Sequence, residues 1–212
     1  GNLSNFDVFE VAKGPCAVAR AIQQDAVEGI TFSHAQFPPD HAIERLGITD
    51  NIDAVVEEIL DYQVDGIIAA SVAMSSDLSE RCRAAGVPMV LFNRSQDDPN
   101  MSAVTSDNIA GGRKVAEFLL AAGHRRIGYI AGWDGASTQR DREAGFTSAL
   151  AEAGVELLSR AEGDFVMEKA AEATRAMFSS DPPDAVFVAN DHMALAVMDT
   201  LRFELGMKVP ED

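Results

Sequence analysis

The sequence contains few cysteines and few basic residues for its length. Its 212 residues include only two cysteines, Cys16 and Cys82, which form neither a CxxC pair nor a metal-binding spacing. Two well-separated cysteines favour a reducing compartment, so we expect a cytoplasmic protein. Lys and Arg number 17 against 34 Asp and Glu, which gives a net charge of −17. Because so acidic a surface repels phosphates, we expect this segment not to bind DNA or an anionic membrane by itself.

Long apolar runs and catalytic motifs are also missing. No apolar stretch approaches the roughly 18 residues of a membrane-spanning helix. Residues 1–7 lack the basic and apolar regions of a signal peptide. The four histidines show no HExxH motif or other metal spacing, and neither a GxSxG elbow nor a phosphate-binding loop occurs. These absences predict no membrane span, no metal ion, no cofactor and no enzymatic activity.

What the sequence does contain is an alternation of short apolar runs and amphipathic segments. The apolar runs predict buried strands at residues 64–70, 89–92, 102–105, 127–131 and 185–189. The amphipathic segments predict helices at residues 52–60, 76–85, 109–122, 140–153, 168–178 and 191–205. Within the helix at 109–122, the apolar side chains expected to face inward are Ile109, Val115, Ala116, Leu119 and Leu120. Strands that alternate with helices predict an α/β fold with parallel sheets covered on both faces.

Two stretches interrupt this alternation. Residues 93–100 form the most loop-like segment, so we expect a lobe boundary there, with an N-terminal lobe at 1–94 and a C-terminal lobe at 95–212. Lobes of roughly 100 residues are large enough to fold around their own cores. Residues 6–48 are harder to interpret, because Pro15 lies inside a helical pattern and Pro38 and Pro39 interrupt the chain again. Within that stretch, residues 30–32 are a candidate strand.

Several segments match one known family in order and spacing. They are residues 64–68 (VDGII), 86–94 (GVPMVLFNR), 107–108 (DN) with 111–112 (GG), 122–127 (AGHRRI), 137–146 (STQRDREAGF), 189–194 (ANDHMA) and 209–212 (VPED). Residues 1–5 add a weaker match. No single motif is decisive, but their common order from residue 64 to the end is specific. The chain resembles the effector-binding domain of the lactose-repressor (LacI/GalR) family of transcriptional regulators.

This resemblance implies a type I periplasmic-binding-protein fold, with two Rossmann-like lobes and a ligand in the cleft between them. It also implies a homodimer that contacts operator DNA only through an N-terminal head, which this sequence lacks. In the family an apolar strand precedes the position of Gly1, and a further strand follows the VPED segment. The resemblance therefore implies that both lobes are incomplete here, with the C-terminal elements missing.

The strongest candidate ligand-binding residues follow the predicted strands, because open α/β sheets bind ligands at the carboxyl ends of their strands. The guanidinium of Arg142 and the amide of Asn190 suit hydroxyl groups of a small ligand. Asp191 is expected instead as the N-cap of the next helix. By the resemblance, Arg142 stands where the family has an effector-contacting arginine, and Phe165 stands where an aromatic ring stacks on the ligand.

Weaker candidates each have a structural alternative, such as a turn or an ordinary surface position. They are Asn93, Asp107, Arg140, Ser71 and Asn5. The single tryptophan, Trp133, follows a strand end and either lines the cleft or caps the lobe.

We therefore predict an effector-sensing domain that binds a sugar or polyol between two lobes and controls operator binding by a transcriptional regulator. The alternative is an exported sugar-binding protein of an ABC importer, which shares the fold. The GHRRI, STQRDREAGF and VPED segments favour the regulator. An enzyme on a Rossmann-like fold is the third possibility, but no nucleophile or general base is recognisable.

Overall fold

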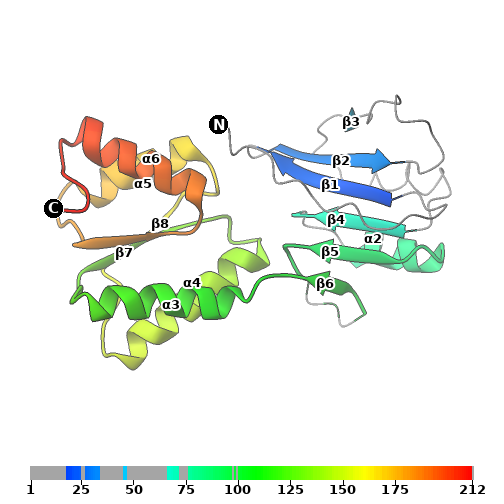
Figure 1. Ribbon diagram of the computed structural model, residues 1–212, viewed down its shortest axis with the longest axis horizontal. Coiled ribbons are helices and arrows are strands. Elements are labelled where there is room, and N and C mark those ends of the chain that lie inside the picture. Colours follow the sequence, from blue (N-terminus) through cyan, green and yellow to red (C-terminus); the bar gives the residue numbers. More distant parts are fainter. Residues whose placement is uncertain are drawn as a thin grey trace.

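The polypeptide forms two β-sheets that lie side by side (Figure 1). The computed structural model describes residues 18–24, 27–33, 45–46, 66–71, 76–96, 98 and 100–211. One sheet has six strands in the order β3-β2-β1-β4-β5-β6, and the other has three in the order β8-β7-β9. The α/β class with parallel sheets is therefore confirmed, while the helix predicted at 52–60 lies outside the described residues.

The first sheet combines a parallel half with an antiparallel half. Its parallel strands are β1 (Val18–Gln24), β4 (Gly66–Ala70), β5 (Met89–Phe92) and β6 (Ser102–Val104). The strands β2 (Val27–Ser33) and β3 (Arg45–Leu46) continue the sheet in antiparallel pairing, and α2 (Ser76–Ala84) follows β4.

The antiparallel half was predicted only in part. The candidate strand at residues 30–32 is confirmed as the end of β2, but β1 was not predicted as a strand. Seven consecutive residue pairs join β1 to β2, from Val18 with Ser33 to Gln24 with Val27. This pairing between neighbours overrides the weak local preference of the segment, because strand formation depends on cross-strand partners more than on intrinsic propensity.

The second sheet is parallel and is covered by helices on both faces (Figure 1). Its strands are β7 (Ile127–Ala131), β8 (Ser159–Glu162) and β9 (Ala185–Val188). One face carries α3 (Asn108–Ala121) and α4 (Ser137–Glu152). The other carries α5 (Met167–Met177) and α6 (Asp191–Asp199), which continues as the π-helix η1 (Thr200–Glu204). The helix predicted at 191–205 therefore exists but changes its hydrogen-bonding pattern at Thr200.

The central strand β7 lies at the middle of the core. All five of its residues are buried, as expected for an apolar strand covered on both faces. The rings of Tyr129, Phe146 and Phe187 pack together with centroids 4.8 to 5.7 Å apart. Such aromatic contacts stabilise a core beyond the apolar area that they bury. The edge strand β8 was not predicted, because its Ser-Arg-Ala-Glu sequence alternates between half-buried and exposed positions rather than forming an apolar run.

The two helices α3 and α4 approach each other closely at two glycines. A Cβ atom on Gly112 would lie 2.0 Å from the carbonyl oxygen of Arg142, and one on Gly145 would lie 2.0 Å from that of Ile109. The expectation that Ile109 faces inward is wrong, since the residue is 53% exposed. At this end of α3 the helix contact is made through backbone at Gly112, which leaves the longer Ile109 side chain on the outer side.

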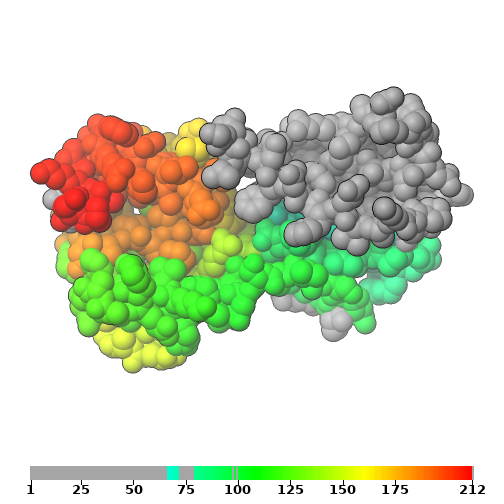
Figure 2. All heavy atoms as spheres, viewed as in Figure 1, coloured from blue at the N-terminus to red at the C-terminus, as the bar shows by residue number. Residues whose placement is uncertain are grey.

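The chain passes between the two sheets after β6 rather than near residue 94. Strand β6 pairs with β5, from Val90 with Ser102 to Phe92 with Val104. In the space-filling view the segment between β6 and α3 forms a continuous green bridge between the two lobes (Figure 2). The strands up to Val104 thus belong to the first sheet, about ten residues later than the loop at 93–100 indicated. That loop connects two strands of one sheet because Asn93 and Val104 are joined by a backbone hydrogen bond.

Burial of Tyr129 predicts a loss of stability at alkaline pH. The side chain is fully buried, and this burial raises the pKa of its phenol to about 12. Because an unfolded tyrosine ionises near pH 10, the folded state retains the proton longer. The stabilisation is complete below pH 10 and is lost as pH rises towards 12, by roughly 2–3 kcal/mol in total. Urea unfolding between pH 9 and pH 12 should show this loss in the natural protein. In Tyr129→Phe the loss should shrink, and an identical pH dependence in both proteins would contradict the assignment.

Candidate functional site

Backbone strain in the described residues gathers directly after the strands. The non-glycine residues with positive φ are Ser71 (59°), Asn93 (73°), Asp164 (51°) and Phe165 (62°). Ser71 follows β4, Asn93 follows β5, and Asp164 and Phe165 come just after β8. Left-handed backbone is unfavourable for such residues and is often found at functional sites. Three of the four were candidates from the sequence, and all lie at the carboxyl ends of the strands.

In the first lobe the structure brings two candidates into contact. The amide Nδ2 of Asn93 donates a hydrogen bond of 2.8 Å to Oγ of Ser71. The backbone supports this contact, because Ser71 N–H donates to the carbonyl of Phe92 over 2.9 Å. Asn93 and Ser71 thus form one polar corner where two adjacent parallel strands end.

In the second lobe Arg142 occupies a junction of three elements. It lies on the second turn of α4 and is half-buried. Its Nε donates to Oδ1 of Asn108 at the start of α3 over 2.9 Å, and its Nη1 donates to the carbonyl of Ala189 after β9 over 2.5 Å. These bonds use two of the five N–H donors of the guanidinium. Within the described part of the chain, the remaining three have no protein acceptor.

Asn190 lies next to the carbonyl that Arg142 contacts, and it has a structural task of its own. Its Oδ1 accepts a hydrogen bond of 2.9 Å from the backbone N–H of Met193, which makes Asn190 the N-cap of α6. The expectation that Asp191 caps this helix is wrong, since Asp191 is the first helical residue. The cap bond uses the amide oxygen only, so the NH2 group of Asn190 keeps its donors for another partner.

Asp107 is used in the same way at the start of α3. Its Oδ1 accepts a hydrogen bond of 2.9 Å from the backbone N–H of Ala110. Asp107 is therefore the N-cap of α3, a structural role different from the turn that was considered. The next residue, Asn108, is buried and accepts the hydrogen bond from Nε of Arg142.

Phe165 and Trp133 lie against glycines of one loop that follows β7. A Cβ atom on Gly132 would lie 2.2 Å from Cε1 of Phe165, so the Phe165 ring covers the backbone there. A Cβ atom on Gly135 would lie 2.2 Å from Cζ2 of Trp133. The Trp133 side chain is 42% exposed. The Trp133 ring of this loop is thus partly exposed to solvent. The Phe165 ring, which comes from the segment after β8, covers Gly132, the first residue of the loop.

Arg140 is the candidate that the structure separates from the others. The residue is exposed, and among the described residues its side chain makes only a long contact of 3.4 Å, from Nη1 to the carbonyl of Gly135. It points back along the same loop rather than into the junction around Arg142. Asn5 lies outside the described residues.

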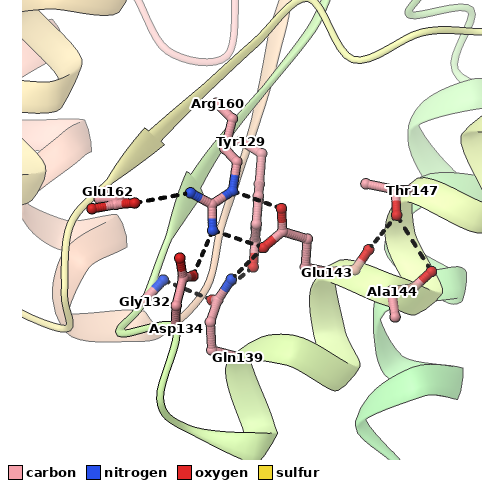
Figure 3. Close-up of polar contacts among 9 residues, drawn as sticks. All are labelled: Tyr129, Gly132, Asp134, Gln139, Glu143, Ala144, Thr147, Arg160 and Glu162. Atoms are coloured by element: carbon pink, nitrogen blue, oxygen red, sulfur yellow. Dashed lines mark hydrogen bonds and ion pairs between the residues drawn. The ribbon is translucent and has the colours of Figure 1, made fainter.

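A polar network that runs from the buried Gln139 to the exposed Arg160 holds this loop to the sheet (Figure 3). The fully buried Gln139 accepts hydrogen bonds through Oε1 from the Tyr129 hydroxyl, over 2.9 Å, and from the Gly132 N–H, over 2.7 Å. Its Nε2 donates to Glu143 over 2.8 Å, and Glu143 in turn accepts from Nε of Arg160 over 2.6 Å. Arg160 also donates to Asp134 in the loop over 2.5 Å. The hydrogen bond to Glu143, together with Asp134, raises the pKa of the Arg160 guanidinium.

Sequence reasoning did not select the residues that support the candidates. Asn108 and Gln139 both lie within segments that carried the resemblance, yet their polar side chains gave no reason to place them in a core. Buried amides are tolerated only with hydrogen-bond partners, and these partners come from other elements of the fold. The local sequence therefore contained the residues but no signal for their role.

Membrane-spanning helices and metal-ligand clusters are both absent from the described residues. No helix there is both long and apolar enough to cross a membrane. No group of three or more His, Cys, Asp or Glu side chains is arranged there to hold a metal ion.

Comparison with known proteins places this geometry in a family. Residues 24–211 match the family model of periplasmic binding proteins and the sugar binding domain of the LacI family. The chain belongs to this family. Among curated relatives, this LacI-type chain is 38% identical to the HTH-type transcriptional regulator CelR of Thermobifida fusca over 191 residues. That alignment covers 87% of the chain and 55% of CelR, so the chain spans about half the length of this relative.

Two further similarities support the assignment. The chain is 32% identical over 235 residues to the HTH-type transcriptional repressor PurR of Aliivibrio salmonicida, covering 97% of the chain and 68% of that protein. A solved CelR–cellobiose complex superposes with a TM-score of 0.68 at 35% identity, covering 76% of this LacI-type chain and 50% of the CelR chain. The resemblance inferred from the motifs is therefore confirmed.

Proposed function

We propose that this chain is the effector-sensing part of a transcriptional regulator and that it binds a sugar between its two lobes. The observation that carries the proposal is the guanidinium of Arg142, which two protein acceptors hold in place while three N–H donors remain for a ligand. Planar, pre-oriented donors suit the neighbouring hydroxyls of a sugar. The relatives of this family that it matches are named as transcriptional regulators, and one of them has been solved with cellobiose.

The remaining candidates supply the complementary contacts in this proposal. The NH2 group of Asn190 adds a donor beside Arg142, and the ring of Phe165 offers an apolar face to the sugar. Asn93 and Ser71 approach from the first lobe. Because the contacts come from both lobes, a bound sugar favours the lobe orientation in which both sets reach it. A ligand shifts such an equilibrium only by its different affinity for the two orientations.

DNA binding is assigned to a segment outside these 212 residues. The net charge of −17 is unfavourable for contact with a phosphate backbone, and the chain spans about half of its CelR relative. We further propose a homodimer in the cytoplasm. The exposed apolar side chains of Leu195 (54%) and Phe203 (81%) on α6 and η1 are available for such a contact. Sedimentation equilibrium should then show a dimer that Phe203→Glu weakens; a monomeric natural protein would oppose this part of the proposal.

The exported binding protein of an importer is the competing function. The open reading frame upstream of Gly1 decides between the two. A helix-turn-helix segment of roughly 50–60 residues supports the regulator, whereas a signal peptide supports the importer. An enzymatic role has the least support, because the described residues offer Arg142 and amides at the site but no nucleophile with a neighbouring base.

Sugar binding is tested by calorimetric titration with cellobiose, followed by a panel of other mono- and disaccharides. The matched variants are Asn190→Ser, which retains a helix-capping oxygen but lacks the NH2 donors, and Asn190→Ala, which lacks both. We expect Asn190→Ser to bind sugar more weakly while its unfolding midpoint stays near that of the natural protein. Asn190→Ala should lose about 1 kcal/mol of stability as well. Failure of the natural protein to bind any sugar of the panel would overturn the ligand class.

A further inference from the structure

Two contacts join the lobes between the loop after β5 and the loop after β7. The guanidinium of Arg94 lies over the ring of Trp133, 5.6 Å from its centroid. One residue further on, the backbone N–H of Ser95 donates a hydrogen bond of 2.9 Å to Oγ of Ser137. Arg94 and Ser95 belong to the first lobe, and Trp133 and Ser137 belong to the second. Arg94 and Ser95 are consecutive residues, and Trp133 and Ser137 lie four residues apart at the end of one loop, so we expect the two contacts to form or break together.

The second-lobe side of this contact is held firmly in place. Gln139 binds the Gly132 N–H, and Arg160 binds Asp134, so both ends of the network in Figure 3 fasten the residues that flank Trp133. The Trp133 ring itself lies against the backbone at Gly135. Ser137, at the start of α4, is 5% exposed. The loop is therefore fixed to the second lobe. When the contact opens, we expect Arg94 and Ser95 to move away from it together with the first lobe.

We propose that Arg94 and Ser95 form an interlobe latch with Trp133 and Ser137, and that this latch sets how often the lobes adopt the orientation that binds the effector. Arg94 directly follows Asn93, and Trp133 directly follows Gly132, which Phe165 covers. The latch thus lies next to two of the proposed sugar contacts, Asn93 in the first lobe and Phe165 in the second. When the latch forms, the sugar-binding side chains of the two lobes are brought within reach of one ligand.

The latch is weak enough to act as a switch. Arg94 is buried and Trp133 is 42% exposed, so their cation–π contact favours the closed pair by roughly two- to thirtyfold in population. A single neutral hydrogen bond adds a factor of similar size. Contacts of this size bias an equilibrium without locking it, so effector binding can still decide the orientation. The coupling to effector rests on the proposed function, whereas the latch itself does not.

The test measures amide hydrogen exchange of Ser95 in the sugar-free protein. The Ser95 N–H donates to Ser137 rather than to Trp133, so its exchange rate reports whether the lobes remain together. We expect Trp133→Leu to raise the exchange rate of the Ser95 amide roughly two- to thirtyfold. Trp133→Phe, which keeps an aromatic face, should lie closer to the natural protein. Ser137→Ala removes the acceptor and gives the rate of an unlatched amide. An unchanged Ser95 rate in Trp133→Leu overturns the latch.

The buried amide of Tyr129 is the control for global destabilisation in the same experiment. If its exchange also rises in Trp133→Leu, Arg94→Ala replaces that variant and acrylamide quenching of fluorescence becomes the measurement. Trp133 is the single tryptophan of the sequence, so the signal is unambiguous. Quenching should rise in Arg94→Ala and stay unchanged in Arg113→Ala, whose guanidinium pairs with Glu152 instead. Equal quenching in Arg94→Ala and the natural protein also overturns the latch.

Repeating the exchange measurement with cellobiose distinguishes a failure of the latch proposal from a failure of the proposed function. In a protein that binds this sugar, the Ser95 amide should exchange more slowly once sugar is added. If cellobiose binds and the rate does not fall, the coupling is wrong although sugar binding is correct. If no sugar binds, the proposed ligand is wrong, while the comparison of variants without sugar still decides whether the latch exists.

Discussion

Gly112→Ala should destabilise the second lobe by about 3 kcal/mol or more. The added Cβ would lie 2.0 Å from the carbonyl oxygen of Arg142 and 3.0 Å from the backbone nitrogen of Phe146. Both atoms belong to the backbone of α4 and cannot turn away as a flexible side chain would. The two helices must therefore separate, which opens the packing around Phe146, a fully buried ring. The measurement is the midpoint of urea unfolding followed by far-UV circular dichroism.

The preceding residue provides the matched control. Gly111 lies on the same helix, and a Cβ atom there would meet nothing within 4 Å. Gly111→Ala should stabilise the protein by roughly 0.5–1 kcal/mol, because alanine favours the helix over glycine. Two neighbouring substitutions of the same chemical type should thus move the unfolding midpoint in opposite directions. Equal shifts in both variants would show that α3 and α4 are not packed as described.

Arg142→Ala should weaken sugar binding more than any other single change at the site. Hydrogen bonds from a charged donor contribute about 1.5–3 kcal/mol each, so losing one or more predicts a roughly tenfold to hundredfold loss of affinity or more. Arg142→Lys keeps the positive charge but lacks the planar set of donors, and we expect it to recover only part of the loss. Calorimetric titration with the sugar that binds the natural protein measures the effect.

Arg140→Ala is the control for this prediction. Arg140 is two residues away on α4, carries the same charge and is exposed, with a single long contact to Gly135. Its removal should change sugar affinity by less than about threefold, because an exposed charge is well screened by solvent. If Arg140→Ala weakens binding as much as Arg142→Ala, the site lies towards the Gly135 loop and not at the junction with Asn108. Circular dichroism shows whether the loss of the bonds to Asn108 and Ala189 has disturbed the fold.

Elements with strong local patterns were predicted well. The apolar run at 127–131 became β7 with the same bounds, and residues 89–92 became β5. Strand β8 was missed because an edge strand needs no apolar run. The hairpin of β1 and β2 was missed because its stability comes from pairing across seven residues. Sequence patterns therefore indicated strands with a local apolar run reliably, and strands that form through pairing with their neighbours poorly.

The sequence indicated the main candidate ligand-binding residues but not all of their structural roles. The position after a strand and the side-chain chemistry pointed to Asn190, and the resemblance added Arg142 and Phe165; all three lie on the side of the second sheet where its strands end, although their binding role stays a prediction. The assignment of the helix cap to Asp191 rather than Asn190 was wrong, because Asp and Asn are equally good caps and only the backbone geometry at the helix start distinguishes them.

The sequence by itself determined the alternation of strands and helices, the order of the family motifs and an acidity that is unfavourable for direct DNA contact. These properties depend on periodicity and composition, which are local. Only the tertiary structure decided that Asn108 holds Arg142, that Gly112 lies against the carbonyl of Arg142, and that Arg94 reaches Trp133 across the lobes. Each of these contacts joins residues some 30 or more positions apart. Such contacts depend on how whole elements pack against one another, and no pattern within one segment records that packing.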